Sequence, residues 1–205
     1  VLGEWIKARG NRDNVVLITK GGLPMGPELK GLSKDYLPRA CEASLRRLQT
    51  DYIDVYFAHD DDPATPIGES LEVFAGLIQA GKIRAAGASN YDNAQLAEAL
   101  AAGKGQAAYT VFQPHYNLAW RGEYEGACED MCVKHNLGVI TYFSLGAGFL
   151  TGKYRSKADM DGKARGGTAG MYFNDANLAM LGRLDEVAKR HNATMAQVAL
   201  AWIMA

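Results

Sequence analysis

Short apolar segments alternate with longer segments of helical spacing along the chain. Five runs rich in β-branched and aromatic residues predict strands: NVVLITK (14–20), IDVYFAH (53–59), RAAGASN (84–90), AYTVFQP (108–114) and GVITYFS (138–144). These runs are nearly continuous in apolar residues, as is typical of strands that are covered on both faces. Strands that alternate with helices at this spacing indicate parallel βαβ units.

The segments between the runs carry helix signals. One helical face is formed by Leu37, Cys41, Leu45 and Leu48, although Pro38 leaves the start of that helix open. Further helices are expected over about 122–135, 177–191 and 195–205, with a long loop over 152–175. The other expected boundaries are N-caps at Thr65 (with Pro66 in the first turn), Asp92 and Thr194, and ends at Gly81 and Gly103.

Two architectures fit this alternation, a (β/α)₈ barrel and a doubly wound open sheet. A dinucleotide-binding doubly wound domain needs G-x-G-x-x-G between a strand and a helix. The glycines Gly146 and Gly148 follow the fifth run, but no helix begins directly on them. The glycine pattern therefore favours the barrel.

Polar or aromatic residues stand at the end of each predicted strand. They are Lys20, His59, Ser89 with Asn90, Gln113, and Tyr142 with Ser144. In a barrel the carboxyl ends of all strands converge on one rim, where active sites lie. One such residue alone is an ordinary exit or core residue, but the same position in five successive units predicts a shared site.

The residue types at this predicted rim suggest its chemistry. Burial lowers the pKa of a lysine, so Lys20 can form a Schiff base or act electrostatically on a neighbouring phenol. His59 can donate a hydrogen bond to a carbonyl oxygen. Amide and hydroxyl side chains can hold a planar amide, and Tyr142 can stack on a flat ring. A flat ring that bears an amide describes nicotinamide.

Composition narrows the class of protein. The chain has 205 residues with a net charge of −1, which provides no electrostatic footprint for nucleic acid or anionic membranes. No apolar run reaches the ~18 residues of a membrane span. Cys41, Cys128 and Cys132 lack metal-ligand spacing and are interpreted as buried or free thiols in a reducing, cytoplasmic compartment, so no metal is expected.

Several strings together resemble the aldo-keto reductases, (β/α)₈ barrels that bind a nicotinamide cofactor without a Rossmann fold. They are ITK (18–20), SLRRLQTDYIDVYFAH (44–59), TPIGESLEVFAGLIQAGKIRAAGASN (65–90), QPHYNL (113–118), GVITYFSLGAGFLTGKY (138–154) and TMAQVALAW (194–202). The resemblance covers essentially the whole chain. The serine in YFSLGAGFLTGKY, where Ser-Pro-Leu is commoner in the family, is similar to certain bacterial subgroups.

The resemblance implies roles for the residues at the strand ends. Lys20 and His59 match two members of the catalytic tetrad of Asp, Tyr, Lys and His. The other matches are to cofactor-binding positions: Ser89, Asn90 and Gln113 for the carboxamide, Tyr142 for the stacking ring, and Ser144, Leu145, Gly148 and Lys153 for the pyrophosphate turn. Tyr116 and Trp120, with His115, are candidate walls of the substrate pocket. The acidic string 60–62 is interpreted as a turn and helix-entry charge.

The resemblance also implies what the segment lacks. The tetrad's aspartate and tyrosine would precede Val1, and the eighth strand with the turn for the adenosine 2′-phosphate would follow Ala205. We therefore expect one partial barrel domain over 1–205, with about five of eight strands, lacking the first two and the last. As a segment of a longer reductase it is expected to be inactive alone.

For the complete enzyme the resemblance implies reduction of a small aldehyde or ketone to an alcohol by hydride transfer from NADPH, or from NADH. Two alternatives stay open from the residues. One is a lyase or aldolase barrel with a Schiff base on Lys20, which leaves Gln113 and Tyr142 without a task. The other is a non-catalytic nucleotide-sensing barrel, like the channel-associated relatives of the family.

Overall fold

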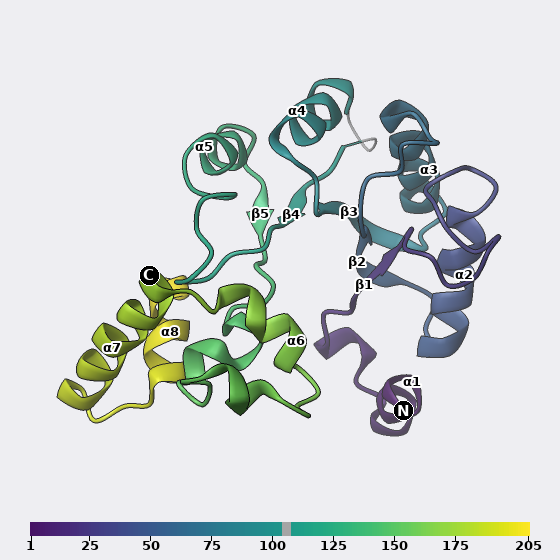
Figure 1. The fold of residues 1–205 in the computed structure, drawn as a ribbon. Coiled ribbons are helices and arrows are strands. Elements are labelled where there is room, and N and C mark those ends of the chain that lie inside the picture. Colours follow the sequence, from purple (N-terminus) through teal and green to yellow (C-terminus); the bar gives the residue numbers. More distant parts are fainter. Residues whose placement is uncertain (104–107) are drawn as a thin grey trace. The chain divides into compact units, whose positions relative to one another are not determined.

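The computed structural model describes residues 1–103 and 108–205, and these form two compact units. The first unit contains Val1–Gln113 and Ala127–Ile140, and the second contains Pro114–Gly126 and Thr141–Ala205. Figure 1 labels the elements of both units in chain order. The expectation of a single partial barrel domain stays a prediction.

The first unit contains a parallel sheet of five strands in the order β1-β2-β3-β4-β5. The strands are β1 Ile18–Gly21, β2 Ile53–Ala58, β3 Ile83–Ser89, β4 Val111–Gln113 and β5 Gly138–Val139. All five predicted strands are confirmed, but β5 ends well before the predicted 144. Within the described residues the order never reverses, so the sheet has no switch point of the kind that defines a doubly wound fold. The five strands of this chain, in sequential order and alternating with helices, form part of a (β/α)₈ barrel.

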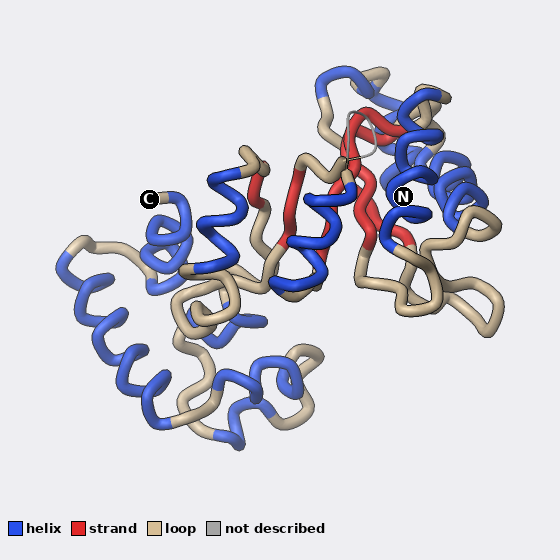
Figure 2. Tube along the Cα trace, turned by 90° about the horizontal axis from the view of Figure 1, so that it is seen from above, coloured by secondary structure: helices blue, strands red, loops and turns tan. Residues whose placement is uncertain are grey.

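The helices of the first unit lie along the outer side of this sheet (Figures 1 and 2). They are α1 Leu2–Arg9, α2 Leu37–Leu48, α3 Ile67–Gln79, α4 Asn93–Ala102 and α5 Ala127–Lys134, with a 3₁₀ turn at Arg12–Asn14. The predicted face of α2 is confirmed, because Leu37, Cys41 and Leu45 are buried. Between the sheet and α3, the ring of Phe74 contacts Tyr56 and Tyr109 at centroid distances of 6.0 and 5.6 Å.

Two predicted helix starts are wrong. Thr65 is not the N-cap of α3: its hydroxyl donates to Asp62 at 2.6 Å, and Pro66 occupies the N-cap position. Helix α5 begins at Ala127 instead of about 122, because turns at 121–126 and the positive φ of Gly126 (84°) delay it. The side-chain caps at Asp92 and Thr194 are confirmed, and each forms a capping box.

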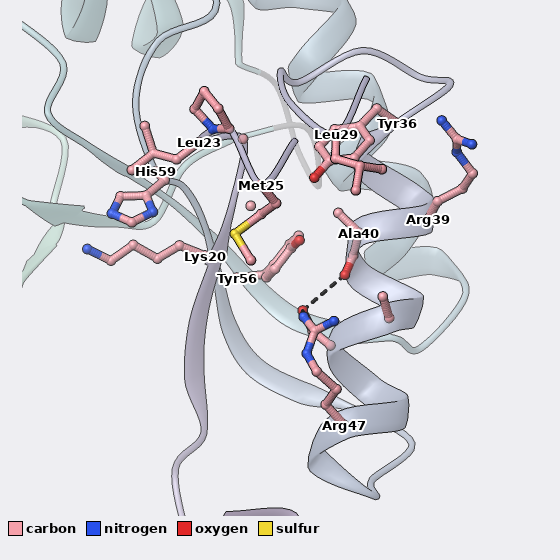
Figure 3. Close-up of a pocket in the computed structure, with 15 residues that line it drawn as sticks. Lys20, Leu23, Met25, Leu29, Tyr36, Arg39, Ala40, Arg47, Tyr56 and His59 are labelled. Carbon is pink, nitrogen blue, oxygen red and sulfur yellow. Dashed lines mark hydrogen bonds between the residues drawn. The ribbon is translucent and has the colours of Figure 1, made fainter. Parts of the chain in front are cut away.

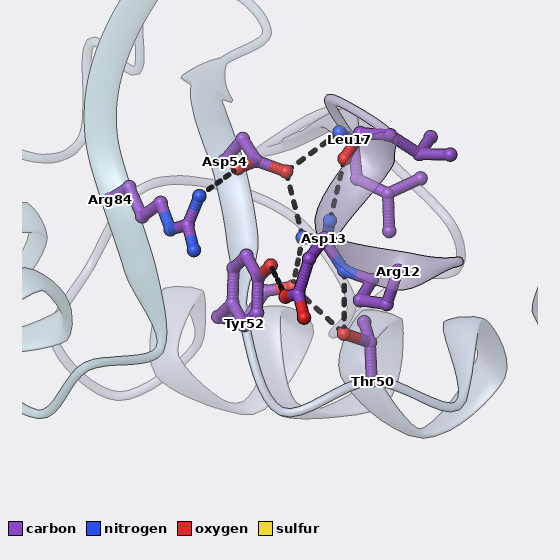
Figure 4. Close-up of polar contacts among 8 residues, drawn as sticks. Arg12, Asp13, Leu17, Thr50, Tyr52, Asp54 and Arg84 are labelled. Carbon is purple, nitrogen blue, oxygen red and sulfur yellow. Dashed lines mark hydrogen bonds and ion pairs between the residues drawn. The ribbon is translucent and has the colours of Figure 1, made fainter. Parts of the chain in front are cut away.

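A polar cluster closes the amino end of the sheet in the first unit (Figure 4). The Asp54 carboxylate accepts the Leu17 N–H at 2.8 Å, Arg12 Nη2 at 2.7 Å and Arg84 Nη1 at 2.9 Å. Both guanidinium groups also lie over the ring of Tyr52, at 3.8 and 4.0 Å from its centroid. This end of a (β/α)₈ barrel serves stability, while the opposite end carries chemistry.

The second unit is built of helices and turns around its own core. Its elements are η2 Gly146–Thr151, η3 Lys157–Met160, α6 Gly166–Ala169, η4 Gly170–Tyr172, α7 Asp175–Arg190 and α8 Met195–Met204. The expected long loop over 152–175 thus contains three short helical turns. The core includes Phe149, Tyr172 and Leu181, all without exposed surface.

Neither a membrane-spanning helix nor a cluster of metal-ligating side chains is found among the described residues. No helix there is long and apolar enough to cross a membrane. No group of three or more His, Cys, Asp or Glu side chains there has the geometry of a metal site. Cys128 and Cys132 are buried on α5, as their helical spacing predicts.

Candidate functional site

Lys20 and His59 stand side by side at the carboxyl ends of two paired strands. Gly21 of β1 is the register partner of Ala58 in β2, and its carbonyl accepts the His59 N–H at 2.9 Å. Both side chains line a cavity of about 500 Å³ (Figure 3). The cavity is walled by Leu23 and Met25 on the loop after β1, and by α2.

The electrostatics of this pair favour an uncharged histidine. Burial lowers the pKa of Lys20 below its ordinary value. Burial also lowers the pKa of His59, and the charge of Lys20 lowers it further against the opposing effect of Asp60. At neutral pH His59 is therefore a neutral imidazole that can donate one N–H, beside an ammonium that is poorly solvated.

Ser89 and Gln113 end the next two strands of the same unit and are directly paired. The fully buried Ser89 hydroxyl donates to the Gln113 carbonyl at 3.0 Å. The side-chain oxygen Oε1 of Gln113 is buried and has no hydrogen-bond partner among the described residues. A buried acceptor without a donor is costly, so this position favours a ligand that brings an N–H.

Asn90 has a structural task that the sequence did not predict. Its Nδ2 donates to the His59 carbonyl at 2.8 Å, which ties the end of β3 to the end of β2. Its backbone is left-handed, with φ of 59°. A non-glycine residue in that region is uncommon and often marks a functional site. Asn90 thereby holds the backbone that presents the His59 imidazole.

The acidic string after His59 shapes a turn, as interpreted from the sequence. Asp62 accepts the Leu32 N–H at 2.8 Å and the Thr65 hydroxyl, and Asp61 accepts Gln95 Nε2 at 2.9 Å. These carboxylates connect the loop after β2 to the loop after β1 and to helix α4, Asn93–Ala102.

Tyr142 belongs to the second unit. Its backbone N–H donates to the Pro114 carbonyl at 3.0 Å, and an isolated parallel bridge pairs it with His115. The two rings stack, with centroids 5.0 Å apart and planes at 18°. The ring of Tyr142 therefore rests on an imidazole that is only 8% exposed.

The backbone after Tyr142 is held in a sparsely populated conformation. Phe143 has a φ of 54°, and its carbonyl accepts Asn117 Nδ2 at 2.9 Å. The Ser144 hydroxyl lies 3.2 Å from that of Thr141, and Leu145 packs against the core of the unit. Asn117 has no exposed surface, so the side chain that restrains this turn is itself fixed.

The turn continues through three left-handed residues, Gly146, Ala147 and Gly148, with φ of 57°, 53° and 97°. The N–H groups of Gly146 and Gly148 are used inside the turn, where they donate to Phe143 and Leu145 at 2.6 and 2.9 Å. Gly148 instead makes room for Lys153: a Cβ built on it would lie 2.7 Å from Lys153 Cε. The Lys153 ammonium therefore lies directly beside Gly148 of the turn.

The two candidate walls of the substrate pocket have defined neighbours within the second unit. Tyr116 donates its hydroxyl to Glu125 at 2.8 Å and packs against Tyr124 and Trp202. Trp120 stacks on His115, with centroids 4.8 Å apart and planes at 14°. The Trp120 indole N–H is buried without a partner among the described side chains.

Sequence reasoning missed Asn117 and Tyr172. Asn117 lies inside the QPHYNL string, but its spacing does not show that it holds Phe143. Tyr172 contacts His115 Nε2 through its hydroxyl from a segment 57 positions away. A contact between residues so far apart in the sequence leaves no local sequence pattern that could predict it.

Known proteins are similar to this chain in sequence. A sequence model of the Aldo/keto reductase family matches residues 1–205. The chain is 31% identical to an aldo-keto reductase of Schizosaccharomyces pombe whose name specifies NADP(+), over 100% of this chain and 62% of that protein. It is 33% identical to the L-glyceraldehyde 3-phosphate reductase of Escherichia coli K12, over 94% of this chain and 58% of that protein. A probable voltage-gated potassium channel subunit beta of Arabidopsis thaliana is 33% identical, with 98% of this chain and 64% of that protein covered.

The chain belongs to the aldo/keto reductase family. It spans about three fifths of the length of the curated relatives that it matches.

Proposed function

We propose that the full-length protein reduces an aldehyde or ketone to an alcohol with NADPH. The observation that carries this proposal is the unpartnered acceptor of Gln113. Its buried Oε1 lacks a donor among the described residues, and the carboxamide of nicotinamide brings an N–H of the required kind. The Ser89 hydroxyl, which donates to the Gln113 carbonyl at 3.0 Å, fixes the chain at that point.

The remaining cofactor contacts are proposed residue by residue. In the first unit, Ser89, Asn90 and Gln113 hold the carboxamide. In the second unit, Tyr142 stacks on the nicotinamide ring, the turn of Ser144, Leu145 and Gly148 follows the pyrophosphate, and Lys153 neutralises its charge. The position of Lys153 against Gly148 supports this last role, because it places an ammonium beside the turn, where it can pair with an anion.

The residues of the 500 Å³ cavity are proposed to act on the substrate carbonyl. The cofactor, when bound, supplies the hydride. Burial and the charge of Lys20 lower the pKa of His59, so its imidazole is neutral. It donates its N–H to the carbonyl oxygen and orients the substrate. Lys20 stabilises negative charge as it develops on that oxygen, and lowers the pKa of the proton-donating tyrosine that the family resemblance implies.

The lowered pKa of Lys20 also favours a second candidate, because a lower pKa increases the fraction of neutral amine, the form that adds to a carbonyl substrate to give a Schiff base. The likeness to a channel subunit supports the third, a barrel that binds the cofactor but turns over slowly. Each makes a different prediction for binding, turnover and covalent trapping.

The experiment uses the full-length protein, titrated with NADPH and with NADH while tryptophan fluorescence is followed, and then assayed with a panel of aldehydes. The proposal expects saturable NADPH binding and NADPH oxidation. Lys20→Met should lower kcat/KM by about a hundredfold or more while the NADPH Kd changes less than about threefold. Binding without turnover would favour the sensing barrel. Absence of binding, with borohydride trapping of substrate on Lys20, would favour the lyase.

A further inference from the structure

A column of three parallel rings lies within the second unit and ends at Tyr142. His115 is its middle member, with Trp120 on one face and Tyr142 on the other. The rings of Phe143 and Tyr172 meet His115 edge-on, at interplanar angles of 78° and 83°. The imidazole is thus enclosed by aromatic rings on both faces and at its edge, which restricts it to one plane.

A chain of hydrogen bonds fixes the proton of this imidazole. Asn117 Oδ1 accepts the Ala119 N–H at 2.8 Å, which orients the side-chain amide so that Nδ2 is the donor. Nδ2 lies 2.9 Å from the Phe143 carbonyl and 3.4 Å from the Tyr172 hydroxyl. Because the Tyr172 oxygen accepts from Asn117, its own proton is directed at His115 Nε2. Nε2 is therefore an acceptor, and Nδ1 carries the proton.

The charges around the ring agree with this assignment. Burial lowers the pKa of His115, and only Glu123 opposes that effect among the described groups that act on it. Burial raises the pKa of Tyr172 to about 12, against a lowering by the Asn117 hydrogen bond, so the phenol keeps its proton at neutral pH. His115 is neutral there and keeps its bond to Tyr172.

We propose that His115 is a positioning residue for cofactor binding, which sets the plane of the Tyr142 ring through the Trp120–His115–Tyr142 column. This inference rests on the proposed function, in which Tyr142 carries the nicotinamide. A planar ligand on Tyr142 has to use the face opposite His115. Trp120 and Tyr172 fix the plane of the His115 ring, and the His115 ring fixes the plane of Tyr142. The orientation of a ligand stacked on Tyr142 therefore depends on His115.

The test compares two replacements of similar bulk in the full-length protein. His115→Phe keeps a flat ring in the column, and His115→Leu fills the space without one. We expect His115→Leu to raise the NADPH Kd about three- to tenfold, which is the usual worth of an aromatic pair. His115→Phe keeps the flat ring but loses the bond to Tyr172, so it should raise the Kd less, by about twofold. His191→Leu, at an exposed histidine of the same unit, is the control and should not change the Kd.

A double-mutant cycle with Tyr142→Ala shows whether His115 acts through Tyr142. In the Tyr142→Ala background we expect His115→Leu to have no further effect on the Kd. The same loss in both backgrounds, or equal affinities for the Phe and Leu variants, would overturn the inference while leaving the proposed function intact. If wild type binds no NADPH, the proposed function fails and the inference fails with it.

Tyr172→Phe provides a test that does not touch the ring column. It removes the hydroxyl that bonds to Nε2, so the ¹⁵N imidazole shifts of His115 should change from a single tautomer in wild type to a mixture. The NADPH Kd should rise in parallel, by about twofold or more. If circular dichroism shows that His115→Leu does not fold, Tyr172→Phe tests the inference in its place. An unchanged NADPH Kd together with a changed His115 tautomer would then overturn the inference.

Discussion

Arg12 Nη2 lies 2.7 Å from Asp54 Oδ2, although the two residues are 42 positions apart in the chain. The same guanidinium donates to the Tyr52 carbonyl at 2.9 Å and to the Thr50 hydroxyl at 2.8 Å. One side chain thus ties the segment before β1 to the start of β2, at the end of the sheet opposite to Lys20 and His59.

Asp54→Asn should destabilise the protein by about 2–4 kcal/mol, because it leaves two guanidinium groups without their shared carboxylate. Burial alone would raise the pKa of Asp54, but the Leu17 N–H, Arg12 and Arg84 lower it overall. A lowered pKa stabilises the fold above the unfolded value of about 4, and that stability is lost as pH falls through the folded value. Urea unfolding at pH 7 and at pH 3 measures both effects, and the gap between wild type and variant should shrink at pH 3. Asp185→Asn, at an exposed pair with Lys189, is the control and should leave the midpoint unchanged.

The half-buried His59 and the buried His115 should make the free energy of unfolding fall on mild acidification. His59 and His115 have lowered pKa values, so below about pH 6.5 the unfolded chain binds protons that the folded chain does not. The free energy of unfolding should therefore decline from pH 7 toward the folded pKa values and level off below them. His115→Phe should reduce this slope in chemical unfolding, whereas His135→Phe, at an exposed position, should not. Equal slopes for all three proteins would contradict the prediction.

Gly87→Ala should destabilise the sheet, since the new methyl group would lie 2.6 Å from Phe57 Cε1 and 2.8 Å from the Val111 carbonyl. Overpacking of this kind costs about 1–3 kcal/mol. Gly76→Ala is the matched control. It lies inside α3 with open space where the Cβ would go, so it should stabilise the fold by about 0.5–1 kcal/mol. Thermal unfolding of both variants should thus give shifts of opposite sign.

Gln113→Leu should weaken NADPH binding by about tenfold, because it removes the buried acceptor proposed for the carboxamide. The fold should be retained or slightly stabilised, as an unpaired polar atom is lost. Gln79→Leu, at the exposed last position of α3, should change neither property. Equilibrium titration beside thermal unfolding separates the two readouts, and an unchanged Kd for Gln113→Leu would remove the main support for the proposed cofactor site.

The order of elements was predictable because it depends on local patterns. Near-continuous apolar runs indicated the five strands, and capping residues such as Asp92 and Thr194 indicated helix starts. Thr65 failed as a cap because Asp62 competes for its hydroxyl and Pro66 displaces the helix start by one position. The glycine pattern favoured the barrel over the doubly wound sheet. The order of the strands in the sheet, which only the structure shows, decides between the two.

The candidate site was predictable in its strand-end residues and not in their connections. The spacing showed that Lys20 and His59 end neighbouring strands, and the register confirms it. It did not show that Asn90 holds the His59 carbonyl, or that Tyr172 reaches His115 from a distant turn. Such contacts depend on tertiary folding, where residues with no common sequence pattern are brought together.

The strictly sequential strand order also bears on how the chain is made. Each ladder joins a strand to the one synthesised just before it, from β1 with β2 to β4 with β5. Every strand after β1 therefore finds a partner edge already present when it leaves the ribosome, and none of these has to wait for a distant segment. Pairings of short sequence separation close small loops and form quickly. The sheet can be extended one βα unit at a time during synthesis, each new unit covering the edge that the previous one left exposed.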